Sequence, residues 1–354
     1  MKVLITGGGG FVGARLARSL LARGQLNGQT ITSLVLTDQV PAPADLLADT
    51  RVQDRTGPLQ DQVAALRDEP FDGVFHLASA VSGECELDFE LGMRSNLDST
   101  RVLLDALRLA GASTGKPARL VFSSSVAVYG PDPSFALPSV VADDTLPAPQ
   151  TSYGVQKLIC EHLISDYTRK GFIDGRAARL VTVTVRPGKP NGAASSFFSG
   201  LIREPLAGVE SVCPVDDSVS HPVSSPARTV DGLIAVYEAS REAFGGRLAM
   251  NLPALNVSVR EMLDALEEVA GSAVRARVKF ERDERIAGIV ANWPSGASAA
   301  RAIKLGLKPH ESFADIIRQY ITDCEKAPNA AEALKGLVNR EGRRGTESPG
   351  GRAT

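Results

Sequence analysis

The stretch T-G-G-G-G-F-V-G, residues 6–13, stands between an apolar run and a helical pattern near the start of the chain. Gly7, Gly10 and Gly13 follow G-x-x-G-x-x-G spacing, which permits a tight turn, close approach of the backbone to a pyrophosphate, and packing of the helix on the strand. The start of such a helix also offers unpaired N–H groups and a positive dipole to phosphates. A glycine-rich turn can be purely structural, so the rest of the chain must support a dinucleotide site.

Short apolar runs alternate with helical patterns through the first half of the chain. Such alternation is typical of a parallel sheet with helices on both faces. We therefore expect an α/β fold with a Rossmann-type, doubly wound parallel sheet and a smaller C-terminal α/β substrate lobe. The expected strands are 3–6, 33–37, 73–77, 120–123 and 180–185, and the expected helices are 11–23, 93–109, 158–167 and 258–270.

Composition excludes several classes of function. A net charge of −2 with scattered basic residues gives no argument for nucleic acid or an anionic membrane as partner. The four cysteines lie far apart, and the four histidines do not cluster with them, so we expect neither disulfides nor a metal site. No apolar run approaches the roughly 20 residues that span a bilayer, and the chain opens directly on a strand pattern, without a signal peptide. We expect a cytoplasmic protein.

The second expected strand ends in V-L-T-D-Q, which places Asp38 where a carboxylate can accept hydrogen bonds from both ribose hydroxyls. An acid there repels a 2′-phosphate, so NAD is favoured over NADP. The competing explanation is an aspartate that closes the strand as a turn former. In V-F-H-L-A-S-A, small residues at a strand end suit a nucleotide, while His76 is interpreted as a packed strand residue. Asp54 is either a contact of the adenine or a solvated loop carboxylate.

A second motif, S-Y-G-V-Q-K, places Tyr153 and Lys157 at i and i+4, on one helix face. Lowering a tyrosine pKa from about 10 to about 7 requires about 4 kcal/mol of preferential phenolate stabilisation. A lysine ammonium and a positive nicotinamide ring can supply it, so Tyr153 would be a general base while hydride leaves the same carbon. Ser125 closes the expected strand in L-V-F-S-S-S-V-A-V-Y-G, where its hydroxyl can hydrogen-bond the reacting oxygen.

In this order the motifs resemble the extended short-chain dehydrogenase/reductase family, also described as the NAD-dependent epimerase/dehydratase family. The resemblance covers roughly residues 1 to 190 and rests on T-G-G-G-G-F-V-G, Asp38, H-L-A-S, N-L-D-S-T, F-S-S-S-V-A-V-Y-G and Y-G-V-Q-K. It implies NAD binding and a catalytic group of Ser125, Tyr153 and Lys157, with a mostly structural role for Asn96. The implied cofactor residues are Gly7, Gly10, Phe11, Val12, Gly13, Asp38, Asp54, Leu77, Ala78, Ser79, Tyr153, Lys157 and Pro187.

The texture of the chain changes after Pro187, where Gly, Pro, Ser and Asn become frequent. Beyond it, Ser258 and Glu261 have the spacing of a capping box. The expected parts are an NAD-binding domain at 1–187 with a return segment near 228–255, a mainly substrate-binding lobe at 188–325, and a disordered tail at 343–354.

Two branches of the family fit poorly. Its sugar-nucleotide dehydratases carry an Asp-Glu pair where Ser125 and Val126 stand here, so the acid and base for water elimination are missing. Its sugar-nucleotide epimerases share the tyrosine and lysine, but the motifs by which many of them hold the nucleotide are altered here to V-R-P-G-K-P-N-G-A-A-S-S-F and S-H-P-V-S-S-P-A-R-T-V-D. An epimerase that reduces and reoxidises bound NAD stays the alternative. A protein that binds NAD without turnover is a third, but it has no need for the Ser-Tyr-Lys group.

The altered segments instead resemble the D-erythronate dehydrogenase branch, as do L-A-S-A-V-S-G-E-C-E-L-D-F-E, I-R-E-P-L-A-G and C-P-V, up to about residue 325. That branch implies oxidation of a small sugar acid at C2 by NAD, giving a 2-keto acid. His221 is a departure, because we expect an aromatic or bulky residue there.

A four-carbon polyhydroxy acid needs hydroxyl and amide partners and one cation for its carboxylate. We expect Lys189 or Arg203 to meet the carboxylate; for all candidates, loop capping or a solvated surface role is the competing explanation. The family also implies a homodimer that packs through the long helices before and after the catalytic motif. The hydroxyl and amide candidates are Ser82, Ser125, Asn191, Ser195 and Ser196.

Overall fold

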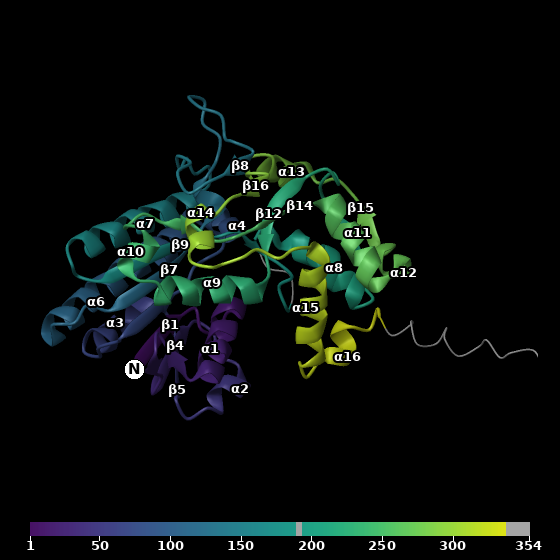
Figure 1. Ribbon diagram of the computed structural model, residues 1–354. Coiled ribbons are helices and arrows are strands. Elements are labelled where there is room, and N and C mark those ends of the chain that lie inside the picture. Colours follow the sequence, from purple (N-terminus) through teal and green to yellow (C-terminus); the bar gives the residue numbers. More distant parts are fainter. Residues whose placement is uncertain (189–192, 338–354) are drawn as a thin grey trace, which may run out of the picture.

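The computed structural model describes residues 1–188 and 193–337. Its centre is a seven-stranded sheet in the order β13-β9-β7-β6-β1-β4-β5, with every neighbouring pair parallel (Figure 1). This confirms the expected doubly wound, Rossmann-type sheet. The strands are β1 (Lys2–Thr6), β4 (Ser33–Asp38), β5 (Val52–Thr56), β6 (Gly73–His76), β7 (Arg119–Ser125), β9 (Asp174–Leu180) and β13 (Met250–Asn251).

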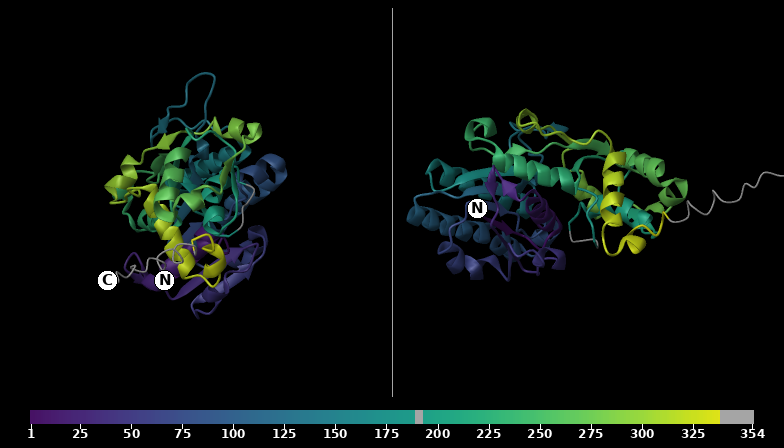
Figure 2. Two further views of the ribbon diagram at one scale, coloured as in Figure 1. Left: turned by 90° about the vertical axis from the view of Figure 1, so that its right-hand side faces the viewer. Right: turned by 60° about the horizontal axis from the view of Figure 1, so that its bottom comes forward.

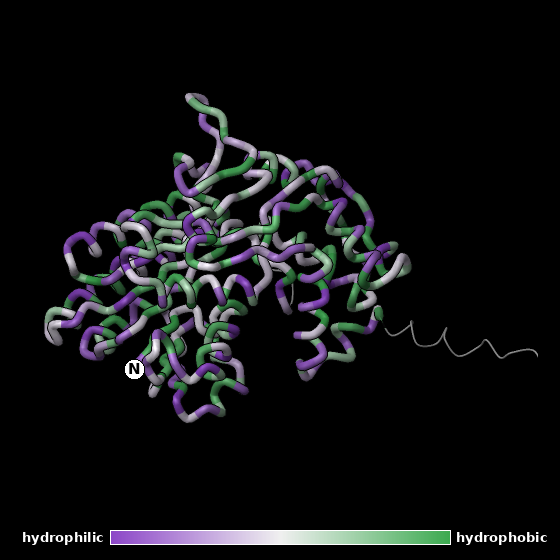
Figure 3. Tube along the Cα trace, in the orientation of Figure 1, coloured by the Kyte–Doolittle hydropathy of each residue, from purple (hydrophilic) through white to green (hydrophobic). Residues whose placement is uncertain are grey.

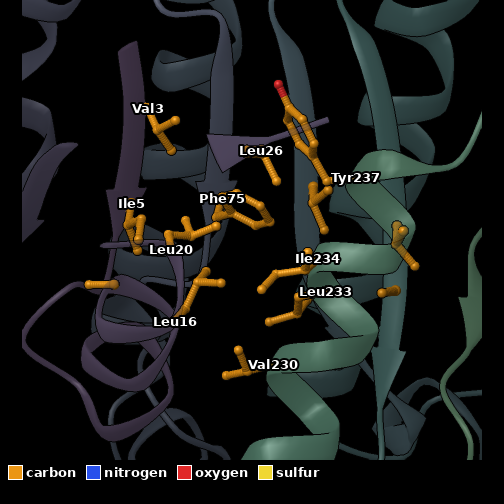
Figure 4. Close-up of a cluster of buried hydrophobic side chains, with 14 of the residues drawn as sticks. Val3, Ile5, Leu16, Leu20, Leu26, Phe75, Val230, Leu233, Ile234 and Tyr237 are labelled. Carbon is orange, nitrogen blue, oxygen red and sulfur yellow. The ribbon is translucent and has the colours of Figure 1, made fainter. Parts of the chain in front are cut away.

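Both faces of the sheet are buried because β1 is apolar at successive positions, and successive side chains point to opposite faces. Val3 and Ile5 join a core under α1 (Phe11–Arg23) and α9 (Pro226–Glu238), shown in Figure 4. Leu4 joins a second core on the other face. That face is covered by α3 (Leu59–Arg67), α6 (Ser99–Thr114) and α7 (Ser152–Arg169).

A smaller lobe follows, beside the sheet (Figures 1 and 2). It has its own apolar core between a three-stranded sheet, β10-β12-β14, and three amphipathic helices. Figure 3 shows hydrophobic and hydrophilic residues alternating along these helices, as expected when one stripe of a helix faces a core. The elements are β10 (Thr182–Val183), α8 (Ser196–Leu206), β12 (Ser220–Ser224), β14 (Leu255–Ser258), α11 (Val259–Ala270) and α15 (Phe313–Glu325).

Short elements complete the described chain. In the region of the sheet they are β2 (Gln25–Leu26), β3 (Gln29–Thr30), α2 (Ala44–Leu47), α4 (Ser82–Leu87), α5 (Phe89–Gly92), the π-helical turn η1 (Met93–Asp98), the 3-10 turn η2 (Val126–Val128), β8 (Val140–Val141) and α10 (Arg241–Phe244). Later elements are β11 (Ser211–Cys213), which pairs with β15 (Val278–Phe280), together with α12 (Ser272–Arg275), α13 (Glu284–Val290), β16 (Gly296–Ala297), α14 (Ala300–Lys304) and α16 (Ala330–Ala333).

The expected strand at 180–185 is only partly present, as the two-residue strand β10 (Thr182–Val183), and it does not belong to the central sheet. The strand that pairs with β7 is β9, which ends at Leu180, and the following residues cross into the smaller lobe as β10. β9 carries two buried arginines, Arg176 and Arg179. Charged residues do not suggest a buried strand, and the partners that make their burial possible are distant in sequence. Arg176 donates to the carbonyls of Val236 and Tyr237 at 2.7 and 2.6 Å.

Other local expectations are confirmed or refined. Helix 11–23 and the capping box of Ser258 and Glu261 are present as expected. The expected helix 93–109 begins as the π-helical η1 and continues as α6 to Thr114. The expected tail at 343–354 lies outside the described residues. Within residues 1–188 and 193–337, no helix combines the length and the apolar character needed to cross a membrane.

Candidate active site

A cavity of about 1300 Å³ opens at the carboxyl ends of the parallel strands and is lined by residues of both lobes. Four neighbouring strands reach it at their carboxyl ends, β4 and β7 through their last residues, Asp38 and Ser125, and β1 and β6 through the next residues, Gly7 and Leu77. Parallel sheets bind their ligands at this edge, where successive strand ends meet. The cavity therefore joins the two motifs, which are far apart in the sequence.

The glycine-rich loop is a tight cradle at one end of the cavity. A Cβ on Gly13 would lie 2.0 Å from the carbonyl oxygen of Gly7, so no side chain fits there. The N-cap residue of α1 is Gly10, which has no side chain to cap the helix, so the N–H groups of the first turn suit a phosphate. Gly7, Gly10, Phe11, Val12 and Gly13 all line the cavity. This geometry fits a dinucleotide pyrophosphate.

Asp38 closes β4 beside this cradle and lines the cavity. One oxygen of its carboxylate accepts hydrogen bonds from the backbone N–H groups of Gly9 and Gly10, at 3.0 and 3.2 Å. The other accepts from the N–H of Gln39 at 2.6 Å. The carboxylate is thus fixed at the edge of the glycine-rich loop, as a ribose ligand requires.

The end of β6 is held by a buried chain of hydrogen bonds through His76. Thr100 Oγ1 donates to the carbonyl of Asn96 at 2.6 Å, so His76 Nε2 must carry the proton that it shares with Thr100 at 2.8 Å. Nδ1 then accepts from Thr6 Oγ1 at 2.6 Å. Burial lowers the pKa of His76 to about 3, helped by the charge of Lys157. His76 is therefore a neutral, packed strand residue, as expected.

This chain of bonds shapes the cavity wall that follows β6. Leu77, Ala78 and Ser79 line the cavity. The side-chain oxygen of Asn96 accepts from Ser79 Oγ at 3.0 Å and from the N–H of Ala80 at 2.7 Å. The role of Asn96 in the structure is to hold this loop.

Tyr153 and Lys157 lie on the first turns of α7, facing Ser125 at the end of β7. The helix can approach this closely because residue 154 is a glycine, whose added Cβ would lie 2.2 Å from the carbonyl oxygen of Ala127. Its first turn is fixed by Thr151, whose Oγ1 accepts from the N–H of Gly154 at 3.0 Å. All three expected catalytic side chains line the cavity.

Burial shifts the pKa values of Lys157 and Tyr153 in opposite directions. Lys157 is 2% exposed, its Nζ donates to the carbonyl of Ser123 at 2.8 Å, and the same Nζ lies 5.5 Å from the ring centroid of Tyr153. Burial lowers the pKa of Lys157 to about 8. Burial also raises the pKa of Tyr153 to about 12, although hydrogen bonds with Ser125 and Ser79 act in the opposite direction. Proton abstraction by Tyr153 thus needs added positive charge.

A buried ion pair between Glu161 and Arg179 lies next to the catalytic residues. Glu161, one turn after Lys157, receives two hydrogen bonds from Arg179 of β9, at 2.9 and 2.7 Å. It also receives a 2.5 Å bond from the hydroxyl of Ser124, the neighbour of Ser125. These contacts tie α7, β7 and β9 together. Sequence alone does not predict these contacts, because only the fold brings residues of this helix and these two strands together.

Some of the remaining candidate cofactor and substrate residues line the cavity, and others do not. Ser82, Ser195, Ser196 and Arg203 line the cavity. Asp54 and Pro187 are absent from its described lining, and the Asp54 carboxylate instead accepts from the N–H of Ala42 at 3.2 Å and from Thr56 Oγ1 at 3.0 Å. Lys189 and Asn191 lie outside the described residues.

Further residues line the cavity, namely Arg186, Thr182 and Trp293. His221, noted only as a departure, also lines the cavity. Its ring stacks on Phe198 at a centroid distance of 5.0 Å, and its Nε2 lies 2.7 Å from Thr182 Oγ1. Burial lowers the pKa of His221 to about 3, so it is a neutral wall residue. Sequence does not predict this role, because Phe198, on which the ring stacks, is distant along the chain.

Comparison with known proteins is consistent with this geometry. The model of the NAD dependent epimerase/dehydratase family matches residues 3–218. D-erythronate dehydrogenase of Cupriavidus necator is 51% identical, over 91% of this chain and 98% of its own length. D-erythronate dehydrogenase of Haemophilus influenzae is 42% identical, over 91% and 99%. A crystal structure described as the nucleoside-diphosphate-sugar epimerase from Agrobacterium tumefaciens is 42% identical, with a TM-score of 0.84, over 91% of this chain and 94% of that one.

Proposed function

The chain belongs to the NAD dependent epimerase/dehydratase family, and we propose that it is a dehydrogenase that oxidises a small D-erythronate-like 2-hydroxy acid to its 2-keto acid. The observation that carries the proposal is the meeting of Ser125, Tyr153 and Lys157 in one cavity with the glycine cradle. The names and high identities of the two D-erythronate dehydrogenases supply the substrate class.

NAD fits the donors that line the cavity. The glycine-rich loop and the start of α1 would hold the pyrophosphate, Asp38 the adenine ribose, and Lys157 the nicotinamide ribose. Phe11, Val12 and residues 77–79 would pack against the dinucleotide. The carboxylate of Asp38 favours NAD because it would repel the 2′-phosphate of NADP. Bound NAD supplies a hydride acceptor and a positively charged ring.

Tyr153 is the proposed general base. It takes the proton of the C2 hydroxyl while hydride leaves C2, so the products are a 2-keto acid, NADH and one proton. Its pKa of about 12 in the free site must fall to near neutrality, which requires about 7 kcal/mol of preferential phenolate stabilisation. Lys157 contributes a charge fixed 5.5 Å from the ring, and Ser125 orients the reacting oxygen.

An activity screen tests the proposal. NADH formation is followed by ultraviolet absorbance with NAD and four- to six-carbon sugar acids, and we expect turnover with D-erythronate or a close relative. UDP-glucose and UDP-galactose serve as the comparison, because an epimerase would interconvert them without net NADH. Interconversion of a UDP-sugar without turnover of any sugar acid would refute the proposal.

We also propose a homodimer that packs through α6 and α7. Val155 and Ile159 lie one turn apart on the outer face of α7. Both side chains are apolar, yet they are 42% and 38% exposed. Exposed apolar side chains in a row mark an interaction surface. Light scattering should give a dimer for the parent, a monomer for Val155→Glu/Ile159→Glu, and a dimer for the exposed control Leu248→Glu. A monomeric parent would contradict the proposal.

A further inference from the structure

The position of the substrate carboxylate follows from the proposed reaction. In a 2-hydroxy acid the carboxylate is bonded to the carbon that is oxidised, so the cation that binds it must lie next to the catalytic tyrosine. This requirement rests on the proposed function, namely oxidation at C2. A cation at the far end of the cavity would instead suit an acid that is oxidised at a distant carbon.

Arg186 lies at this place. It follows β10 and lines the same cavity as Tyr153 and Ser125. Described residues help to hold its guanidinium: Nε donates to the carbonyl of Val183 and one Nη donates to Ser195 Oγ, both at 2.9 Å. On the cofactor side, its Cζ lies 6.0 Å from the ring centroid of Phe11. The side chain thus spans the space between the cradle and the substrate lobe.

The backbone of Arg186 is fixed as well. Its N–H donates to Ser199 Oγ at 3.1 Å, and its carbonyl accepts from Arg203 at 3.0 Å. Both partners lie on α8, the first helix of the substrate lobe. The guanidinium is therefore preorganised, which reduces the entropy lost when it binds a planar carboxylate.

The charge of Arg186 acts on the catalytic tyrosine. The two groups are close enough for the guanidinium to lower the pKa of Tyr153, while the same interaction acts to raise the pKa of Arg186 against the effect of burial. A guanidinium stays protonated at neutral pH. A carboxylate that binds Arg186 therefore lies within reach of Tyr153.

Of the two cations expected from the sequence, Lys189 lies outside the described residues and Arg203 pairs with a carboxylate. Arg203 is 7% exposed, and besides its bond to the Arg186 carbonyl it forms a 2.6 Å ion pair with Glu204. The adjacent carboxylate neutralises its charge, so its position suits support of Arg186 better than capture of an anion.

From this geometry we infer that Arg186 binds the substrate carboxylate, beside the hydroxyl of Ser195, and thereby directs oxidation to the carbon next to the carboxylate. Arginine suits the task because its planar fork donates two parallel hydrogen bonds to a carboxylate. Two consequences follow. The enzyme should discriminate strongly against the neutral amide of its substrate, and this discrimination should depend on Arg186.

The test compares Arg186→Gln and Arg186→Lys with Arg282→Gln, a control whose arginine is 57% exposed in the same lobe and pairs with Glu284. KM is measured for D-erythronate, for D-erythronamide and for NAD, and melting temperatures check that the variants fold. We expect Arg186→Gln to raise KM for D-erythronate about 100-fold, as for loss of a charge-assisted pair, and the KM for NAD to change less than about 3-fold. The preference for the acid over the amide should collapse.

Arg186→Lys should recover part of that preference, because it restores the charge without the fork. If Arg186→Gln raises the KM for NAD and leaves the acid preference intact, Arg186 serves the cofactor phosphates and the inference is overturned. If Arg186→Gln does not fold, Arg186→Lys decides, since an unchanged KM for D-erythronate and an unchanged acid preference would overturn the inference equally. Failure of the parent enzyme to oxidise any sugar acid would instead be failure of the proposed function.

Discussion

The Nζ of Lys157 donates a 2.8 Å hydrogen bond to the backbone carbonyl of Ser123, on the strand that ends at Ser125. This bond holds an ammonium group in the interior, between β7 and the ring of Tyr153. The lysine is almost fully buried, and burial opposes its charge. The arrangement is therefore costly for the folded state and useful for a tyrosine that must lose a proton.

Replacing Lys157 should separate stability from activity. Its pKa is lowered from 10.5 to about 8 on folding, so the unfolded chain binds the proton more tightly. The corresponding penalty, about 3 kcal/mol, is present in full below pH 8 and disappears as the pH rises to about 10.5. Lys157→Met should thus melt at a higher temperature than the parent at pH 7, with the difference shrinking toward pH 10, and should lose at least about 100-fold in kcat. A lower melting temperature at pH 7 would show that the Ser123 bond outweighs the cost of burial.

Tyr153→Phe removes the proposed base with little change in shape. We expect kcat to fall about 1000-fold, within the range for loss of a general base, and NAD affinity to stay within a few-fold of the parent. Tyr167→Phe, on the same helix, is the control, because its hydroxyl bonds to Asp105 and lies outside the cavity lining. Retained turnover in Tyr153→Phe would remove this tyrosine from the mechanism.

Asp38 should set the choice of cofactor. Asp38→Asn keeps the side-chain volume but removes the charge, so we expect the KM for NAD to rise about 10-fold, as for a lost charge-assisted hydrogen bond. The ratio of kcat/KM for NADP to that for NAD should increase, because the repulsion of a 2′-phosphate is gone. Asp45→Asn is the control, since that carboxylate is exposed and pairs with Arg18. An unchanged ratio would contradict the assignment of Asp38 to the ribose.

The pair of Glu161 and Arg179 should matter for stability. Both side chains are 6% exposed, so Glu161→Gln leaves a buried, uncompensated guanidinium, and the free energy of unfolding should fall by about 3 kcal/mol. Asp166→Asn on the same helix breaks an exposed pair with Arg169 and should cost less than about 1 kcal/mol. Urea denaturation measures both. Equal losses in the two variants would argue against a supporting role for the buried pair.

The extent to which sequence predicts this molecule depends on the distance between interacting residues. The cradle at 6–13 and the pair of Tyr153 and Lys157 are local patterns, whose spacing determines their geometry. Strand β9 is not predicted from the sequence, because Arg179 finds its partner, Glu161, only in the folded state. Likewise, the letters R-P-G-K-P-N do not predict that Arg186 lines the cavity, because α8 and β10 place it there only in the folded chain.

Isotope transfer from D-erythronate that carries deuterium at C2 tests the central claim most directly. The enzyme is incubated with this substrate and NAD, and the reduced cofactor and the product acid are analysed by mass spectrometry. Oxidation at C2 predicts that the deuterium appears in the reduced nicotinamide, in an amount equal to the 2-keto acid formed. Deuterium that stays in the product acid while NADH accumulates would place the oxidation at another carbon and contradict the account.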